Sequence, residues 1–320
     1  MEFNYSRHDL NVGERRRQRL FEMIPGVICW CIISGVVVCS MWQPLMTAVF
    51  MVAFLLYWFL RLLYMNIFLV FSYFRLTIEK NVTWQSRLHA LDSGALTKDM
   101  TKALKRGRGI SRGFAARMHA KQIRAVQKKA LPMPRSEDIY HLVIIPVLKE
   151  NREIVEPGIR AIQKGDYPSE RIIILIAVEE RAADEIKEDM TKLQQEYKND
   201  FADFFMTFHP ADLPGEARVK GANVSYAARE AARYFDEKRI PFDHVIVSCF
   251  DADTVPNPGY FGCLTYYYLI TPERDRASFQ PIPVYHNNIW DAPGFARIID
   301  IGTSYFQLIE ATKDRKSTRL

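Results

Sequence analysis

The stretch Val245-Ile-Val-Ser-Cys-Phe-Asp-Ala-Asp-Thr-Val-Pro-Asn-Pro-Gly259 decides the fold that we expect for this 320-residue chain. It opens with a short apolar run rich in β-branched residues, which predicts a buried strand of a parallel sheet over 245–250. The Pro and Gly residues that follow stop regular structure. Asp251 and Asp253 lie between these two parts, at the carboxyl end of the strand, where open α/β sheets bind their ligands.

The two aspartates form a candidate metal site. In extended backbone, residues two apart point to the same side, so Asp251 and Asp253 are expected to face one ligand together. Two hard oxygen ligands suit Mg²⁺ or Mn²⁺, and such an ion usually also holds substrate phosphates. A bare Asp-x-Asp also arises by chance in a chain of this length, so the strand before it and the turn after it support the prediction.

Strands and helices alternate after residue 136. This order predicts an α/β domain over 136–320, with an open, mostly parallel, Rossmann-like sheet and helices on both faces. No glycine-rich dinucleotide loop or P-loop follows any of the strands, which leaves the metal as the phosphate clamp. The expected strands are 141–145, 171–178, 204–208 and 245–250, and the expected helices are 150–164, 182–197 and 222–235.

Two apolar segments near the N-terminus predict a membrane protein. Residues 24–42 are uncharged, and residues 45–70 are interrupted only by Arg61, which is expected to snorkel to the membrane surface or to face a protein interior. Each segment is long enough to cross a bilayer as a helix. We therefore expect a two-helix transmembrane hairpin over 24–74 in the cell membrane, with a cleaved signal peptide as the weaker alternative.

Basic residues flank both ends of this hairpin. Arginines cluster in residues 1–23, and Lys and Arg are frequent in the linker 75–135. By the positive-inside rule, the N-terminus and the domain 136–320 are expected in the cytoplasm. The linker is expected to be a partly helical segment that lies on anionic lipid headgroups. The alternative is a basic segment that binds nucleic acid, but its place beside the transmembrane helices favours the membrane, so we expect no nucleic-acid partner. Five cysteines without metal-ligand spacing are expected to be reduced.

Polar groups follow each expected strand or lead into the next helix. Taken together they resemble the GT-A fold of glycosyltransferase family 2, the inverting, membrane-associated sugar transferases. The motifs that carry the resemblance are Pro146 to Glu150, Glu179-Glu180, Arg218 to Asn223, and Asp251-Ala-Asp253. The resemblance covers about residues 140–312, and the ordered set of four is more specific than any one motif.

The resemblance implies a donor site for a nucleotide-diphosphate sugar, most simply a UDP-sugar, and a lipid or polysaccharide acceptor in the membrane. The metal would be held by Asp251 and Asp253. The nucleotide-sugar would be bound by Pro146, Glu150, Glu179, Arg218, Lys220, Asn223 and Asp251.

Simpler readings of these residues stay open. Glu179 and Glu180 could open an exposed helix, and Asn223 could be only a first-turn hydrogen-bonding residue. Arg218 and Lys220 precede a helix N-terminus, which is unfavourable for a cation unless an anion is present, and this favours the phosphate role. His209 and His286 are expected to be ordinary loop residues. Trp290 and Tyr285 could stack on a sugar and Gln280 and Asn288 could bind hydroxyls, although a packed Trp is an equal alternative.

The acidic base that the family places downstream of its Asp-x-Asp has no counterpart after Asp253, so no catalytic residue is assigned. The Gln/Arg-x-x-Arg-Trp motif of the polymer-forming members has none either. With the polar tail 313–320, this leads us to expect a C-terminally truncated chain. Two alternatives therefore remain: a catalytically incomplete, nucleotide-binding or scaffold membrane protein, and a metal-dependent nucleotidyl or phosphoryl transferase.

Overall fold

The computed structural model describes residues 11–80, 83–93, 124, 134–211, 213, 216, 219–282, 289–290 and 292–313. Contacts divide the chain into two units. One comprises Met1–Leu69 with Leu213–Ala217, and the other comprises Val70–Asp212 with Arg218–Leu320. The basic linker falls outside the described residues from 94 to 133 except for Arg124, and the helix predicted within it falls there too.

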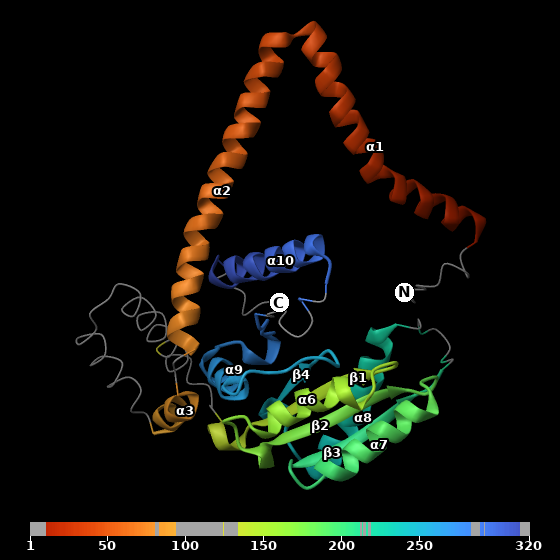
Figure 1. Ribbon diagram of the computed structural model, residues 1–320, viewed down its shortest axis with the longest axis vertical. Coiled ribbons are helices and arrows are strands. Elements are labelled where there is room, and N and C mark those ends of the chain that lie inside the picture. The colour runs from red at the N-terminus through yellow and green to blue at the C-terminus, as the bar shows by residue number, and fades with distance from the viewer. Residues whose placement is uncertain are drawn as a thin grey trace, which may run out of the picture. The chain divides into compact units, whose positions relative to one another are not determined.

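Two long helices carry the N-terminal apolar segments, α1 (Val12–Trp42) and α2 (Pro44–Lys80) (Figure 1). Within them, Val12–Trp42 and Pro44–Phe74 are long and apolar enough to cross a membrane, as predicted. Helix α1 begins well before the apolar run because of a capping box. The Asn11 side chain accepts the Glu14 backbone N–H at 2.9 Å, and the Glu14 carboxylate accepts the Asn11 N–H at 3.0 Å.

Arg61, the one charge within the second apolar segment, has aromatic neighbours one turn earlier in α2. Its Nη1 donates to the hydroxyl of Tyr57 at 3.3 Å, and its guanidinium lies 5.1 Å from the ring centroid of Trp58. A guanidinium over an indole face is attracted by the ring quadrupole. These contacts give Arg61 local partners on the same helix.

Four strands form a parallel sheet within the described residues: β1 (Tyr140–Val147), β2 (Ile172–Glu179), β3 (Asp203–His209) and β4 (Val245–Cys249). Their order across the sheet is β3-β2-β1-β4. β1 and β2 are buried along almost their whole length, which is why their sequences read as continuous apolar runs. The predicted parallel α/β sheet is confirmed, and all four strands lie within two residues of their predicted bounds.

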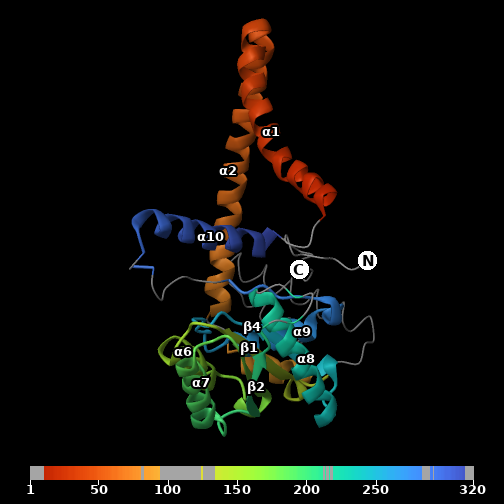
Figure 2. The ribbon, with the colours of Figure 1, turned by 90° about the vertical axis from the view of Figure 1, so that its right-hand side faces the viewer.

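Helices cover both faces of this sheet, as predicted. Helices α6 (Arg152–Gln163) and α7 (Asp184–Tyr197) pack on one face, and α8 (Lys220–Lys238) packs on the other (Figure 2). β1 serves both cores because its side chains alternate: Val143 and Ile145 face the α6 side, whereas Leu142 and Ile144 face α8.

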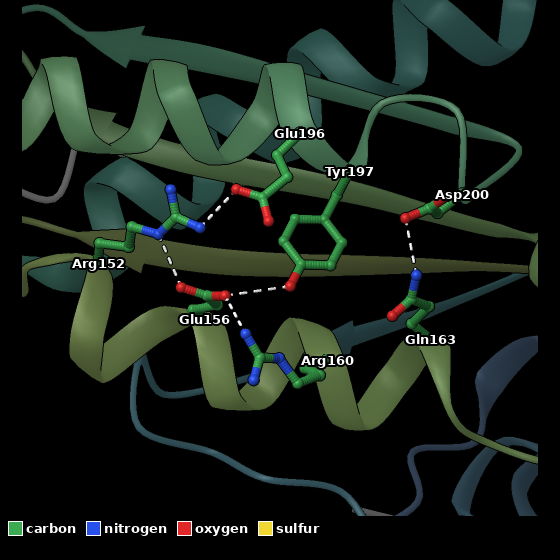
Figure 3. A network of polar contacts seen from close by, with 7 residues as sticks. All are labelled: Arg152, Glu156, Arg160, Gln163, Glu196, Tyr197 and Asp200. Atoms are coloured by element: carbon green, nitrogen blue, oxygen red, sulfur yellow. Dashed lines mark hydrogen bonds and ion pairs between the residues drawn. The ribbon is translucent and has the colours of Figure 1, made fainter.

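A polar network joins α6 to α7 above their shared core (Figure 3). Arg152 bridges Glu156 at 2.7 Å and Glu196 at 2.5 Å, and Glu156 also receives the Tyr197 hydroxyl at 3.2 Å and an ion pair from Arg160. Hydrogen bonds from Arg152, then from Arg160 and Tyr197, outweigh burial and lower the pKa of Glu156 to about 2. Glu156 is therefore the shared acceptor that links the two helices.

Two of the helices that the structure adds to those expected from the sequence, α3 (Trp84–Asp92) and α9 (Tyr260–Ile270), pack against each other. Helix α3 buries Trp84, Leu88 and Leu91, a three-residue stripe at helical spacing. The carboxylate of Asp92 then accepts the backbone N–H and hydroxyl of Ser136 at 3.0 and 2.6 Å, which ties α3 to the start of the α/β domain. The last described helix is α10 (Gly294–Lys313).

Candidate functional site at the carboxyl edge of the sheet

The strand order creates a switch point between β1 and β4. From β1 the chain moves to β2 and β3 on one side, and then returns to place β4 on the other side of β1. At such a point the loops after the two strands diverge and leave a crevice in which α/β proteins bind ligands. β1 ends at Val147 and β4 at Cys249, so the loops that carry Glu150 and Asp251 begin on the two sides of this switch point.

Glu150 is held by the loop that follows β1. One carboxylate oxygen accepts the backbone N–H groups of Leu148 and Lys149, at 2.8 and 3.0 Å. Partial burial by itself raises the pKa of Glu150, but these N–H groups and the charge of Lys220 more than offset it, so the pKa lies below its usual range. Glu150 is therefore a positioned, ionised acid.

Pro146 offers no polar side chain to a ligand. It is a buried residue of β1, paired in register with Ala177 of β2. On the other side of β1, pairing with β4 ends at Ile144, before Pro146. Because proline has no N–H to donate to a neighbouring strand, its place beyond the last β4 pair suits the strand.

Asp251 and Asp253 lie in a tight turn, which corrects the geometry expected from the sequence. Regular β4 ends at Cys249, and the Thr254 N–H donates to the Asp251 carbonyl at 2.9 Å. The two-residue alternation of extended backbone therefore does not apply to this pair. Both residues are exposed, and the side chain of Asp251 is 69% accessible to solvent.

A glycine of α6 sets the position of this turn. A Cβ built on Gly158 would lie only 2.5 Å from the carbonyl oxygen of Thr254. Glycine is therefore needed for the helix backbone to approach the Asp-Ala-Asp turn this closely.

Lys220 is the central cation of the site. It opens α8, and its Nζ forms an ion pair with Asp251. A cation at a helix N-terminus is unfavourable by itself, and the carboxylate supplies the compensating charge. Burial raises the pKa of the Cys249 thiol, while the charge of Lys220 opposes that shift. The same charge acts on Glu150, so Lys220 links the loops on both sides of the switch point.

The carboxylates of Asp251 and Asp253 are the kind of ligand that a hard divalent cation takes, and substrate oxygens would complete its coordination. Within the residues that the structure describes, no group of three or more His, Cys, Asp or Glu is arranged to hold a metal ion. Two aspartate carboxylates nevertheless match the way Mg²⁺ binds through one or two carboxylates plus phosphates and water. Because Asp251 is paired with Lys220, a bound cation would take over part of the role of that ammonium group.

Glu179 lies in a second, buried polar cluster at the ends of β2 and β3. Its carboxylate is 3.3 Å from Nδ1 of His209 and 3.5 Å from Nε of Arg181, and the Glu179 and His209 side chains are each only 7% exposed. The His209 ring also lies 5.4 Å from the ring of Tyr226 on α8. His209 was predicted to be a loop residue, which is wrong, because it is the last residue of β3. The alternation of Phe205, Thr207 and His209 on one face of β3 is the pattern that could have placed it.

Glu180 has a separate, local role. Its carboxylate accepts the backbone N–H of Ala211 at 3.0 Å, and its own backbone N–H donates to the carbonyl of His209 at 3.0 Å. Glu180 therefore joins the ends of β2 and β3.

Asn223 joins the first turn of α8 to the sheet. It is buried, and its Nδ2 donates to the carbonyl of Ala177 at 2.8 Å. Its Oδ1 and the hydroxyl of Thr207 are buried without a hydrogen-bond partner in the described part of the chain. Asn223 thus ties α8 to β2 through Nδ2, while its Oδ1 is left as a hydrogen-bond acceptor.

The structure describes only some of the other predicted binding residues. Arg218, Tyr285, His286 and Asn288 fall outside the described residues. Gln280 is exposed, and Trp290 is 77% exposed with the guanidinium of Arg297 at 5.8 Å from its ring centroid. Trp290 is therefore not the packed core residue that was the alternative prediction.

The chain matches no known protein-family model, and no curated protein is significantly similar to it. The assignment of a function therefore depends on the chemistry of the site.

Proposed function

We propose that this chain is a membrane-bound glycosyltransferase. It would transfer a sugar, with inversion, from a nucleotide-diphosphate donor such as a UDP-sugar to a lipid or polysaccharide acceptor. The observation that supports this most is the switch point itself, where acidic loops from β1 and β4 flank a lysine at a helix N-terminus. Alternating acid and base at a sheet crevice suits a ligand that carries both phosphates and hydroxyl groups.

The diphosphate is the part of the donor that this site can bind best. Lys220 and the positive end of the α8 dipole would form a positive surface for its oxygens. Asp251 and Asp253 would hold Mn²⁺ or Mg²⁺ on the same phosphates, and a bound ion supplies charge neutralisation for the leaving group. Arg218, two residues before the first residue of α8, is proposed to add a second cation.

The nucleoside is assigned to the acidic residues nearer to β2. Glu150 is fixed in its ionised form by backbone N–H groups and can accept hydrogen bonds from ribose hydroxyls. Glu179 is oriented by His209 and Arg181, which leaves its carboxylate in a defined direction. Asn223 keeps α8 against β2, and Pro146 shapes the strand below the loop.

Membrane attachment is the second part of the proposal. The two long apolar helices support a hairpin that holds the chain at the cell membrane, with the N-terminus and the α/β domain in the cytoplasm. The basic linker would lie against anionic lipid headgroups. An enzyme attached in this way meets a membrane-bound acceptor without diffusion from solution. An inverting transfer also needs a base for the acceptor hydroxyl, and we assign that role to none of the described residues.

The test is binding of UDP to the full chain in lipid nanodiscs, by calorimetry, with Mn²⁺ and with chelator. We expect Mn²⁺-dependent binding that Asp253→Asn abolishes. Asp184→Asn is the matched control, because this substitution removes the same charge at a different place. The Asp184 side chain is 94% exposed at the start of α7. Unchanged Mn²⁺-dependent affinity in Asp253→Asn would rule out this metal assignment.

The products formed from a UDP-sugar separate the remaining alternatives. Release of UDP supports glycosyl transfer, whereas release of pyrophosphate would indicate a nucleotidyl transferase. Absence of any nucleotide binding by the folded chain would leave the scaffold function.

A further inference from the structure

Helix α10 exposes an apolar face in the part whose side chains the structure describes. Five large side chains recur at helical spacing along it and fall on one side of the helix. Their exposed fractions are 70% for Phe295, 73% for Ile298, 62% for Ile299, 48% for Tyr305 and 50% for Phe306. An exposed apolar stripe of this length marks a surface for a partner or a membrane.

The polar side chains of the same helix that the structure describes are less accessible than these apolar ones. Arg297, Thr303 and Gln307 are each partly buried, and Nε of Arg297 donates to the carbonyl of Ala292 at 3.0 Å. The Oε1 atom of Gln307 is shielded from solvent and has no hydrogen-bond partner in the described part of the chain. A helix on a water-soluble protein normally buries its apolar side and exposes its polar side. Helix α10 is oriented the opposite way, so exposure of its apolar face to water is unfavourable.

We infer that the apolar face of α10 lies in the interface of the lipid bilayer, at the boundary between headgroups and acyl chains. This rests on the proposed membrane attachment, because α1 and α2 would hold the chain at that surface. Tethering raises the local concentration of lipid around the rest of the chain, so a weakly bound helix stays engaged. The face combines aromatic rings with branched aliphatic side chains, the composition of interfacial helices.

The consequence is a second membrane contact that belongs to the unit carrying the α/β sheet. The transmembrane hairpin would anchor the chain, and α10 would restrict how that unit turns about its anchor. Such a contact suits an enzyme whose acceptor is embedded in the membrane.

Site-specific photo-cross-linking tests this inference in the full chain. The photoreactive amino acid p-benzoylphenylalanine replaces Phe295 or Phe306 on the apolar face, or Phe242 as the matched control. Phe242 is also an exposed phenylalanine, at 56%, but lies before the first residue of β4. The proteins are reconstituted into vesicles of phosphatidylethanolamine and phosphatidylglycerol, irradiated, and analysed by intact mass spectrometry.

We expect lipid adducts at positions 295 and 306 that exceed those at position 242. Adducts to a second copy of the chain, adducts to another segment of the same chain, or lipid adducts no higher than at position 242 would each overturn the inference. Extraction of the same vesicles with alkaline carbonate tests the anchor separately. Loss of the protein into the supernatant would refute membrane attachment by the hairpin, whereas retention together with no lipid adducts would refute only the role of α10.

Discussion

Replacing Gly158 with alanine tests how closely α6 must approach the Asp-Ala-Asp turn. The added Cβ would lie 2.5 Å from the Thr254 oxygen, whereas real Cβ contacts essentially never fall below 3.0 Å. Either the helix or the turn must therefore move by at least roughly half an ångström. The turn has little freedom to yield, because Thr254 is tied back to Asp251 by a backbone hydrogen bond of 2.9 Å.

Two opposing effects set the size of the change in stability. Alanine in place of glycine within a helix is favourable by about 1 kcal/mol. Overpacking of a well-packed contact costs about 1–3 kcal/mol, and the backbone contact here favours the upper end. We therefore expect Gly158→Ala to lower the free energy of unfolding by about 1–2 kcal/mol. Because the displaced backbone carries both aspartates, we also expect Mn²⁺ affinity to fall by about tenfold, equivalent to about 1.4 kcal/mol.

Urea unfolding of the full chain and calorimetric titration with Mn²⁺ measure these two quantities. Gly221→Ala is the matched control for stability, because a Cβ there meets nothing within 4 Å. We expect it to leave stability unchanged or to raise it by about 0.5–1 kcal/mol. If Gly158→Ala were as stable as the parent protein and bound Mn²⁺ equally well, the close packing of α6 on the turn would be refuted.

Two further substitutions have distinct signatures. Lys220→Met removes the competitor for Asp251 and the proposed phosphate contact, so Mn²⁺ alone should bind up to about fivefold more tightly, the effect of a weak exposed ion pair. UDP in the presence of Mn²⁺ should bind more weakly, and calorimetric changes of the same sign for both ligands would contradict this. The second is His141→Gln. Burial lowers the pKa of His141 to about 3, while Nε2 keeps a 2.7 Å contact with Thr265. In the unfolded chain His141 is protonated below about pH 6.5, whereas in the folded chain it stays neutral. The free energy of unfolding should therefore fall by about 1.4 kcal/mol from pH 7.5 to about pH 5.5. His141→Gln should remove that dependence in urea unfolding at the two pH values, and an equally steep loss in the variant would exclude His141 as its source.

Much of the fold was predictable because its elements differ in period. The apolar runs of β1 and β2, the one-face spacing of α6 and the long apolar segments of α1 and α2 each have a local cause. Helix α3 was missed because it is only nine residues long and its three buried side chains make a weak pattern. The start of α1 could have been predicted from Asn11 and Glu14, because a capping box is a pattern of four consecutive residues.

The candidate site was predictable in its members but not in its geometry. Glu150, Glu179, Lys220, Asn223 and Asp251 could be named from their positions after strands or before a helix. Asp251 and Asp253 lie in a turn whose Thr254 carbonyl packs against Gly158, and this contact joins residues that are nearly a hundred positions apart in the chain. His209 became part of a buried cluster only because β3 is the neighbour of β2.

The sequence by itself determined the local structure: strands, helices, apolar segments and the polar residues at their ends. These follow from side-chain period, backbone preference and charge, which act over a few residues. The tertiary structure decided the strand order, and with it the switch point between β1 and β4. It also paired Lys220 with Asp251, enclosed Glu179 with His209, and left the apolar side of α10 facing outward. These features depend on which distant segments pack together to bury apolar surface, and no short stretch of the chain contains that information.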